Sequence, residues 1–342
     1  MCKKIVIPAL IISWLTAGTT QPYNLTETKD IVYGKGWVTN PSEGLKDLLM
    51  DAYIPDNPAT DKAAIIYMHG GGWKSGDKSS RVSDFRDLAA RGFCLFSINY
   101  RMVGDGLVCP PIATGTAPEL PAVRAAVVDC RAAVRYVRAH AAEYGISQDR
   151  IVTLGGSAGA YTSVVACIAE EDSFLNDGPG DPAIPYNNSD ERSKPDLCTE
   201  MFGFTISWLP NFRDDIDSTD PPVLIMHGDA DALIPFQNAY SFRTYFRNEG
   251  IPWELHIVEG GVHGEWFDST NVWMENFINE HLYSNGITWF NPGLPAGPGY
   301  TGGVRWFDLL GRQTWGEAQG RTGVYFRAAD RVLVPGKALL IK

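Results

Sequence analysis

One short stretch of the chain restricts its possible folds more than any other feature. Residues 151–154 are apolar or β-forming, and Gly155-Gly-Ser-Ala-Gly159 follows them directly. Residues 160–169 are then small, apolar and compatible with a helix. A buried strand, a tight turn and a helix are the setting in which Gly-x-Ser-x-Gly presents a reactive serine. The stretch therefore predicts a strand–turn–helix unit with Ser157 at its turn.

The turn around Ser157 has a local chemistry that suits a nucleophile. Gly155 and Gly159 have no side chains, so the backbone can turn sharply enough to point the serine hydroxyl outward. The following helix offers unpaired N–H groups and the positive end of its dipole, which favour developing negative charge. The alternative is a glycine-flanked turn without catalytic chemistry. We predict that Ser157 is a nucleophile.

The size and charge of the chain limit its domain number and its partners. Its 342 residues are enough for one large domain or two, and 44% hydrophobic with 20% charged residues is ordinary for a folded protein. The formal net charge of −11 argues against a nucleic-acid or anionic-membrane partner. The sequence gives no indication of the oligomeric state.

The first residues are typical of a secretion signal. Met1-Cys-Lys-Lys4 is basic, residues 5–15 are apolar, and Thr16-Ala-Gly-Thr19 is small. This is the pattern of a signal peptide, and the apolar run is too short for a membrane anchor. We expect cleavage after residues 1–18 and a secreted, periplasmic or cell-surface protein without stable membrane insertion. A buried first strand is the alternative.

Of the six cysteines, five remain after this cleavage, so at least one thiol is free. Cys94 is expected in an apolar strand, and Cys130 and Cys167 on helix faces, where they serve as small core residues. Cys109 and Cys198 are expected in loops, where export permits a disulfide, and their pairing stays open. No Cys-x-x-Cys or His/Cys cluster has metal-site spacing, so we predict no metal.

Apolar strands alternate with helices over most of the chain. This alternation predicts the α/β class, with a mostly parallel sheet of about eight strands covered by helices on both faces. In the helix predicted for residues 123–141, apolar residues recur every three or four positions. Four arginines occupy its other faces, where we expect them to be solvated: Arg124, Arg131, Arg135 and Arg138. The predicted strands are residues 31–38, 48–54, 63–68, 94–99, 151–154, 202–208, 223–227 and 253–258, and the other helices are residues 160–169, 237–249 and 271–283.

Segments rich in glycine and proline divide the chain. Residues 102–121 and 172–196 are too long for simple connections, and we expect them to line a pocket. Residues 291–303 have the composition of a linker. The chain is therefore predicted to hold a main domain at residues 19–290 and a small β-rich tail at residues 304–342, with short strands at 306–309, 324–326 and 338–341.

Three motifs in this order resemble the α/β-hydrolase fold: His69-Gly-Gly-Gly-Trp73, Asn99-Tyr-Arg101 and Gly155-Gly-Ser-Ala-Gly159. They are similar to the esterase/lipase branch with a His-Gly-Gly-Gly oxyanion loop, which includes hormone-sensitive-lipase-like carboxylesterases and acetyl-xylan or feruloyl esterases. The resemblance covers residues 31–283. It implies an oxyanion hole made by the N–H groups of Gly71, Gly72 and Ala158 and a structural role for His69. A glycine-rich turn without function is the alternative.

The resemblance also implies which residues activate the serine, because the chain order in this fold is Ser, Asp, His. The base is His263, in the loop Gly260-Gly-Val-His-Gly264. His227 is the less favoured candidate, because with Gly228 it matches the structural His-Gly of the family. The acid is Asp231, since His227-Gly-Asp-Ala-Asp-Ala-Leu-Ile-Pro235 matches the family motif. Asp229 is its rival, with turn capping as the other role. His256 and His281 are expected in the scaffold.

These features predict a secreted serine carboxylesterase that needs no cofactor. Gly-Gly-Ser-Ala-Gly in place of the commoner Gly-Asp-Ser-Ala-Gly favours esterases that deacylate polysaccharides. We therefore expect short, acetyl-type esters, free or linked to plant polysaccharide, on which Trp73 and Trp208 could stack. One alternative is a peptidase of the prolyl-oligopeptidase group, disfavoured because we find no large β-propeller. The other is an inactive hydrolase-fold binding protein.

The tail has a resemblance of its own. Phe307-Asp-Leu-Leu-Gly-Arg312, Gly323-Val-Tyr-Phe326 and Ala338-Leu-Leu-Ile341 are similar to the C-terminal β domain of Bacteroidota proteins sorted by the type IX secretion system. A carbohydrate-binding β module is the rival interpretation. A disordered extension is less favoured because apolar residues alternate along the tail.

Overall fold

The computed structural model describes residues 23–106, 120–176, 180–204, 216–264 and 269–283, together with short strands beyond residue 305. The chain divides into two compact units. The larger is Pro22–Asn285, and the smaller combines Met1–Gln21 with Gly286–Lys342. The predicted signal peptide at residues 1–18 and the linker at 291–303 lie outside the described residues.

The larger unit is built on one eight-stranded sheet with the order β1-β2-β4-β3-β5-β6-β7-β8. β2 pairs antiparallel with both β1 and β4, and every other pair in this sheet is parallel. The prediction of a mostly parallel sheet of about eight strands is thus confirmed. The strands are β1 (Leu25–Val38), β2 (Gly44–Pro55), β3 (Lys62–Met68), β4 (Cys94–Ile98), β5 (Ile146–Gly156), β6 (Leu197–Met201), β7 (Val223–Gly228) and β8 (Trp253–Val258).

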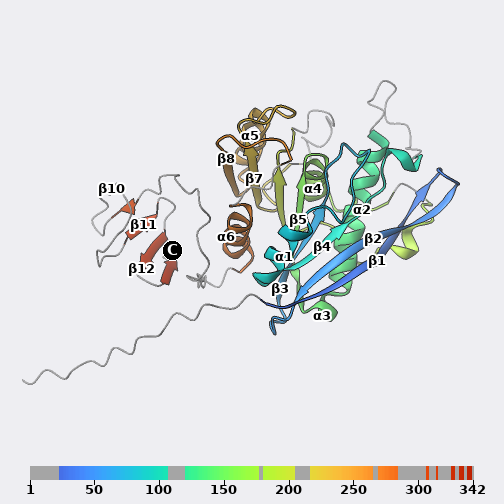
Figure 1. Cartoon of the computed structure of the whole chain (residues 1–342), viewed down its shortest axis with the longest axis horizontal. Coiled ribbons are helices and arrows are strands. Elements are labelled where there is room, and N and C mark those ends of the chain that lie inside the picture. Colours follow the sequence, from blue (N-terminus) through green and yellow to red (C-terminus); the bar gives the residue numbers. More distant parts are fainter. Residues whose placement is uncertain are drawn as a thin grey trace, which may run out of the picture. The chain divides into compact units, whose positions relative to one another are not determined.

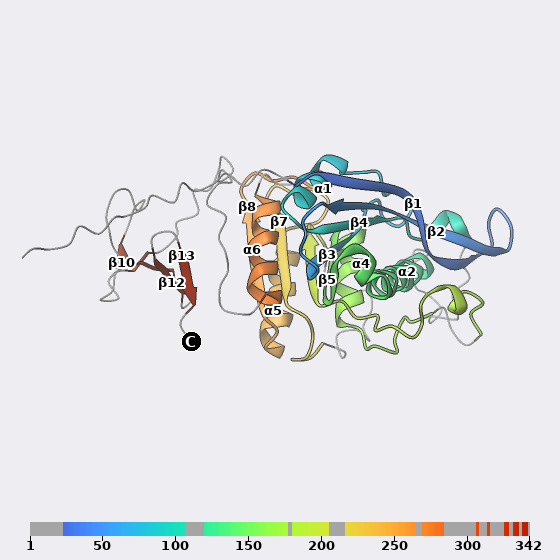
Figure 2. The ribbon, with the colours of Figure 1, turned by 90° about the horizontal axis from the view of Figure 1, so that it is seen from below.

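Helices cover both faces of this sheet (Figures 1 and 2). α2, α3, α4 and α5 pack into one hydrophobic cluster, and α1 with α6 into the other. Every residue of the central strand β3 is buried, as expected for a parallel strand covered twice. The helices are α1 (Val82–Ala90), α2 (Leu120–Ala139), α3 (Ala141–Tyr144), α4 (Ala158–Ile168), α5 (Gln237–Glu249) and α6 (Thr270–Leu282). Among the described residues, the helices include none that is both long and apolar enough to cross a membrane.

One predicted strand was placed wrongly. The strand expected at residues 202–208 is β6, which ends at Met201, and the positive φ of 44° at Phe202 breaks the extended conformation there. Residues 205–208 lie outside the described residues. Cys198, expected in a loop, therefore lies in a buried strand as a free thiol, and Cys109 is outside the described residues. Cys94, Cys130 and Cys167 are buried free thiols, as predicted.

The arginines of α2 are the largest departure from the sequence prediction. Arg131, Arg135 and Arg138 were expected on a solvated face, but they are only 0%, 1% and 3% exposed. Arg124 is half-buried. The described chain between α4 and β6, which covers these side chains, is largely irregular, so its carbonyl groups lack partners in a helix or sheet. A guanidinium group can satisfy them because it supplies five N–H donors. Arg131 alone donates to the carbonyl groups of Ala166, Ala169, Glu170, Glu171 and Ser173.

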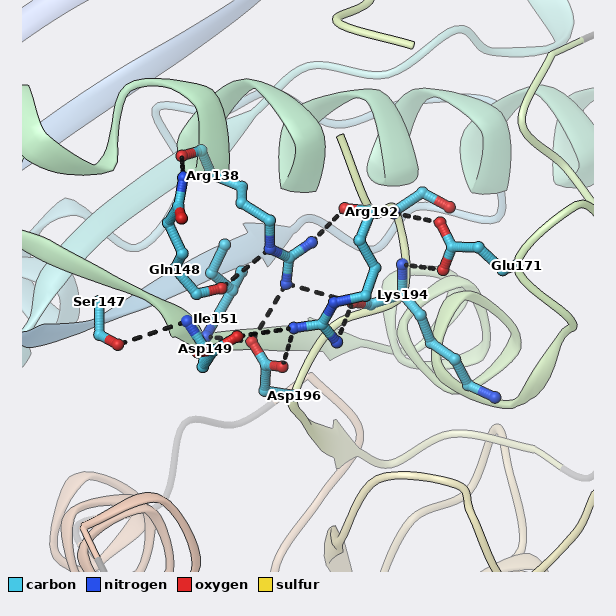
Figure 3. Close-up of polar contacts among 10 residues, drawn as sticks. Arg138, Ser147, Gln148, Asp149, Ile151, Glu171, Arg192, Lys194 and Asp196 are labelled. Atoms are coloured by element: carbon cyan, nitrogen blue, oxygen red, sulfur yellow. Dashed lines mark hydrogen bonds and ion pairs between the residues drawn. The ribbon is translucent and has the colours of Figure 1, made fainter. Parts of the chain in front are cut away.

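Figure 3 shows how residues 192–196, at the end of this segment, are held in place. Asp196 accepts hydrogen bonds from Arg138 at 3.1 Å and Arg192 at 2.7 Å, and from the N–H of Ile151 at 2.9 Å. Residues 192–196 are thus tied to the middle of β5, at Ile151. Ile151 precedes Ser157 by six residues of strand, which corresponds to about 20 Å. These residues therefore do not line a pocket at Ser157, and for the rest of residues 172–196 and for 102–121 that role stays a prediction.

The smaller unit contains an antiparallel sheet with the order β10-β9-β11-β12-β13. Three of its strands lie where the sequence predicts short strands, and the other two were not predicted. The strands are β9 (Trp306–Phe307), β10 (Gln313–Thr314), β11 (Tyr325–Arg327), β12 (Arg331–Val334) and β13 (Lys337–Leu340).

The buried guanidinium group of Arg131 should be essential for stability. We expect Arg131→Gln to lower the free energy of unfolding by roughly 3 kcal/mol or more, because several buried carbonyl groups lose their donor. The matched control is Arg86→Gln, since Arg86 pairs with Glu27 at the surface and its side chain is 55% exposed. Urea unfolding followed by tryptophan fluorescence measures both. Equal losses in the two variants would contradict this account of α2.

Candidate functional site

Ser157 stands at a sharp turn between β5 and α4. Its backbone has φ 56° and ψ −116°, a conformation that L-residues rarely adopt. A Cβ atom on Gly155 would lie 2.1 Å from the carbonyl carbon of Gly159, and one on Gly159 would lie 2.1 Å from the carbonyl oxygen of Met68. Both flanking positions therefore require glycine. The N–H of Ser157 donates to the carbonyl oxygen of Met201 at 3.0 Å.

The structure brings together the three residues predicted as a triad. His263 Nε2 lies 3.1 Å from Ser157 Oγ, and His263 Nδ1 lies 2.8 Å from Asp231 Oδ2. The residues follow β5, β7 and β8, which are parallel strands and end at the same edge of the sheet. The site is thus formed by loops at the carboxyl ends of three strands.

Asp231 is held as an anion. Its Oδ1 accepts hydrogen bonds from the N–H groups of Leu233 at 2.9 Å and Ile234 at 2.8 Å. Burial favours the neutral acid, but the N–H of Ile234, the His263 ring and the N–H of Leu233 outweigh it, so the pKa of Asp231 lies below its ordinary value. An anionic acceptor fixes the proton of His263 on Nδ1 and leaves Nε2 to accept a proton from Ser157.

Asp229, the rival acid, has a different function in the structure. Its Oδ1 accepts a hydrogen bond from the N–H of Gly260 at 2.7 Å, and it makes no hydrogen bond or ion pair with His263 among the described residues. The N–H of Ala230 donates to the carbonyl of Gly261 at 3.0 Å. Asp229 therefore joins the loop that carries the acid to the loop that carries the histidine.

The sequence analysis gave His227 as part of a structural His-Gly motif and as the weaker candidate for the base. In the structure His227 is buried at the end of β7, and its Nε2 lies 3.2 Å from Asp231 Oδ2 and 3.0 Å from the carbonyl oxygen of Ile234. The other two histidines lie in the scaffold, as expected: His256 stacks on Trp273, and His281 packs against Phe277 in α6. The signal for His227 was its position four residues before Asp231.

The glycine-rich loop after β3 lies against the serine. A Cβ atom on Gly70 would be 3.3 Å from Ser157 Cβ, and Gly71 and Gly72 have positive φ angles of 106° and 64°. Within the described residues, the N–H groups of Gly71 and Gly72 have no protein acceptor. The N–H of Ala158 is the first of α4 and points out of the helix end.

His69 supports this loop and does not contact Ser157. It is buried, its Nδ1 donates to the carbonyl of Gly70 at 2.8 Å, and its ring stacks on Tyr100. The Tyr100 hydroxyl donates in turn to the carbonyl oxygen of His69 at 2.7 Å. Burial lowers the pKa of His69, so its ring is neutral at neutral pH.

The aromatic residues near the site pack mainly against one another. Trp73 was considered as a stacking surface for substrate, but it is only 3% exposed, and its Nε1 donates to Thr162 Oγ1. It contacts Tyr161 and Phe204 edge-on. Trp73 is thus a core residue, while Trp208 lies outside the described residues. Phe202 packs edge-on against the His263 ring at 5.0 Å.

Glu200 in β6 was not identified from the sequence, although a lone acid in an apolar strand is a signal. It is completely buried, and its Oε2 accepts a hydrogen bond from the N–H of Gly203 at 2.8 Å. Burial raises the pKa of Glu200 to about 8. Its hydrogen bond closes the corner at residues 201–203, which holds the Met201 carbonyl at Ser157 and Phe202 against His263.

The described part of the site contains the groups for proton transfer but no metal cluster. No group of three or more His, Cys, Asp or Glu side chains among the described residues could hold a metal ion. His263 can take the proton of Ser157, Asp231 can stabilise the resulting cation, and the loop N–H groups can donate hydrogen bonds to a negatively charged oxygen. This combination suits attack on a carbonyl carbon.

Comparison with protein families supports a relation to esterases over part of the chain. A family model described as BD-FAE matches residues 50–205. Esterase LipQ of Mycobacterium tuberculosis is 27% identical over 248 residues, which is 66% of this chain and 53% of that protein. Lipase 2 of Moraxella sp. is 27% identical over 221 residues, 61% of this chain and 45% of that protein. The chain thus spans about half the length of these curated relatives.

Solved structures show the fold. A truncated carbohydrate esterase from gut microbiota superposes with a TM-score of 0.59 and 22% identity, covering 78% of this chain and 99% of that chain. A butyrate-bound esterase of Thermogutta terrifontis gives a TM-score of 0.56 and 23% identity, covering 77% and 95%. The eight-stranded sheet with its helices therefore has the α/β-hydrolase fold predicted from the sequence.

The neutral state of Glu200 predicts a pH-dependent stability. The unfolded chain releases this proton near pH 4.5 and the folded chain only near pH 8, so wild-type stability falls as the pH rises between these values. Glu200→Gln cannot ionise, so its stability relative to wild type should rise across this window by roughly a few kcal/mol. Urea unfolding at about pH 5 and about pH 8 measures the change, with the exposed Glu249→Gln as control. A difference independent of pH would show that Glu200 ionises normally.

Proposed function

We propose that the chain is a serine carboxylic-ester hydrolase that works through an acyl-enzyme. The observation that carries this proposal is the continuous series of contacts from Ser157 Oγ to His263 at 3.1 Å and from His263 to Asp231 at 2.8 Å. The names of the relatives, which include an esterase, a lipase and a carboxylesterase, support it. The presence of all three residues also favours an active enzyme over an inactive binding protein.

The proposed reaction has two halves. Ser157 Oγ attacks the ester carbonyl carbon while His263 Nε2 takes the hydroxyl proton, and Asp231 stabilises the imidazolium. The tetrahedral intermediate collapses, the bond to the alcohol oxygen breaks, and His263 returns the proton to that oxygen. Water then attacks the acyl-serine with His263 again as the base, so that the carboxylic acid is released and Ser157 recovers its proton.

The negative charge on the tetrahedral intermediate needs donors that are already in place. We assign this role to the N–H groups of Gly71, Gly72 and Ala158. Support comes from the closeness of the loop to Ser157 and from the lack of a protein acceptor for Gly71 and Gly72 within the described residues. Loss of one such donor typically costs about 3–4 kcal/mol of transition-state stabilisation.

For the substrate we propose short acyl esters, free or linked to polysaccharide. The Gly-Gly-Ser-Ala-Gly variant of the serine motif is one support. Others are three similar structures: a Thermogutta terrifontis esterase with bound butyrate, the same esterase with bound propionate, and a carbohydrate esterase from gut microbiota. The signal-like residues 1–18 and the sorting-like tail support an exported enzyme.

The two carboxylates near His263 allow a matched test of the mechanism. Ser157→Ala and His263→Ala should each remove nearly all hydrolysis of p-nitrophenyl acetate while the chain stays folded, because the triad works as a unit. Asp231→Asn should be severe, and Asp229→Asn mild, since Asp229 only joins two loops. Rates and circular dichroism spectra give the comparison. A His263→Ala variant that keeps more than about a tenth of wild-type kcat would refute the assignment of the base.

The acyl preference can be measured on p-nitrophenyl acetate, butyrate, octanoate and palmitate. Each additional buried CH₂ group in an open apolar groove would add roughly 0.8 kcal/mol, so a lipase shows kcat/KM rising with chain length. We expect instead the highest kcat/KM on acetate or butyrate and a sharp fall beyond about six carbons, because steric exclusion outweighs the added burial. An optimum at octanoate or palmitate would favour a lipase.

A further inference from the structure

We propose that His227 is a positioning residue of the site: its neutral imidazole donates from Nε2 to Asp231 and fixes the carboxylate that orients His263. This inference rests on the proposed esterase function, since it concerns the same triad. His227 lies at the end of β7, four residues before Asp231, and its side chain is completely buried.

The contacts of the His227 ring define its protonation. Nε2 lies 3.0 Å from the carbonyl oxygen of Ile234 and 3.2 Å from Asp231 Oδ2. Both partners are acceptors, so Nε2 must carry the hydrogen and share it between them. His227 Nδ1 is buried and has no partner within the described part of the chain, which a ring protonated on both nitrogens would not tolerate.

The electrostatics of the site agree with a neutral His227 ring that carries its hydrogen on Nε2. Burial lowers the pKa of His227 more than the Ile234 carbonyl and Asp231 raise it, and a positive charge on His263 lowers it further. Among the described residues, Asp231 and His263 are the titratable groups whose charges act on this ring. A charged His227 would neutralise Asp231 and weaken its stabilisation of the His263 cation. The proposed role of His227 therefore requires an imidazole that donates a hydrogen bond and stays uncharged.

The carboxylate of Asp231 is held from four directions. Leu233 and Ile234 donate to Oδ1, His263 Nδ1 contacts Oδ2 at 2.8 Å, and His227 Nε2 lies 3.2 Å from the same oxygen. Without the His227 contact, the carboxylate is held less firmly in the orientation that positions the His263 ring. Oδ2 would also direct more of its charge to His263, which should make His263 a stronger base in the resting enzyme.

A purely structural role for His227 gives different expectations. In that case the hydrogen bond to the Ile234 carbonyl would only fasten the loop, and its loss would reduce the amount of folded enzyme. The kcat of each correctly folded molecule and the ionisation of His263 would then be unchanged. Both quantities can be measured separately.

The test compares His227→Phe, which keeps a ring but has no donor, with His227→Gln, whose amide can place an N–H near the position of Nε2. The control is His281→Phe, a histidine of α6 outside the site. Active sites are counted by titration with paraoxon, which phosphorylates the similar Thermogutta terrifontis esterase 2, so misfolded molecules do not enter kcat. The substrate is p-nitrophenyl acetate.

We expect His227→Phe to lower kcat per titrated site at least about tenfold with little change in KM, and to move the acid limb of kcat/KM to higher pH. His227→Gln should recover most of kcat and return the limb to its wild-type position. The proposal is overturned if His227→Phe keeps kcat within about twofold of wild type, or if the limb does not move.

A second measurement separates this inference from the proposed function. Proton NMR follows the resonance of the His263 Nδ1–H, which lies against Asp231 Oδ2, without any substrate. His227→Phe should shift this resonance, while His227→Gln and His281→Phe should leave it unchanged. If wild-type protein hydrolyses no ester but this shift is present, the proposed function fails and the coupling stands. If esters are hydrolysed and the shift is absent, only the coupling fails.

Discussion

The strained turn at Ser157 is the constraint on which the rest of the site depends. A non-glycine residue in this conformation costs on the order of 1–3 kcal/mol, so its surroundings must hold it. They do so from both sides: Gly159 packs against the Met68 carbonyl of β3, and the N–H of Ser157 donates to the Met201 carbonyl of β6. These contacts hold the strained backbone in place and thereby fix Ser157 relative to β3 and β6.

A close contact between the loops after β7 and β8 brings Asp231 and His263 to Ser157. β7 and β8 are paired up to Gly228 and Val258, so the loops after them begin side by side. A Cβ atom on Gly228 would lie 2.1 Å from the carbonyl oxygen of Gly261, which shows that the loops touch only because residue 228 is glycine. The hydrogen bond from the N–H of Gly260 to Asp229 completes this junction.

The alternation of apolar strands and helices allowed the parallel sheet to be predicted. The meeting of Ser157, Asp231 and His263 was predicted from their loops after strands together with the family motifs that these loops resemble. The sequence did not allow the burial of Arg131 or the role of Glu200 to be predicted. Their partners are main-chain groups, which every residue possesses and no side-chain pattern announces. Periodicity shows which face of a helix is apolar, but not that an irregular segment covers the polar face.

Two buried carboxyl groups near the serine reach opposite ionisation states for one physical reason. Asp231 receives donors on both oxygens and stays ionised, whereas Glu200 receives one N–H on Oε2, and its buried Oε1 has no partner among the described residues. Burial opposes charge in both, more strongly in Glu200, and only Asp231 has enough donors to outweigh it. A neutral Glu200 and a neutral His227 add no charge beside the pair. The electrostatic attraction between Asp231 and His263 is thus not shared with Glu200 or His227. Under this condition a histidine can remove the proton of a serine.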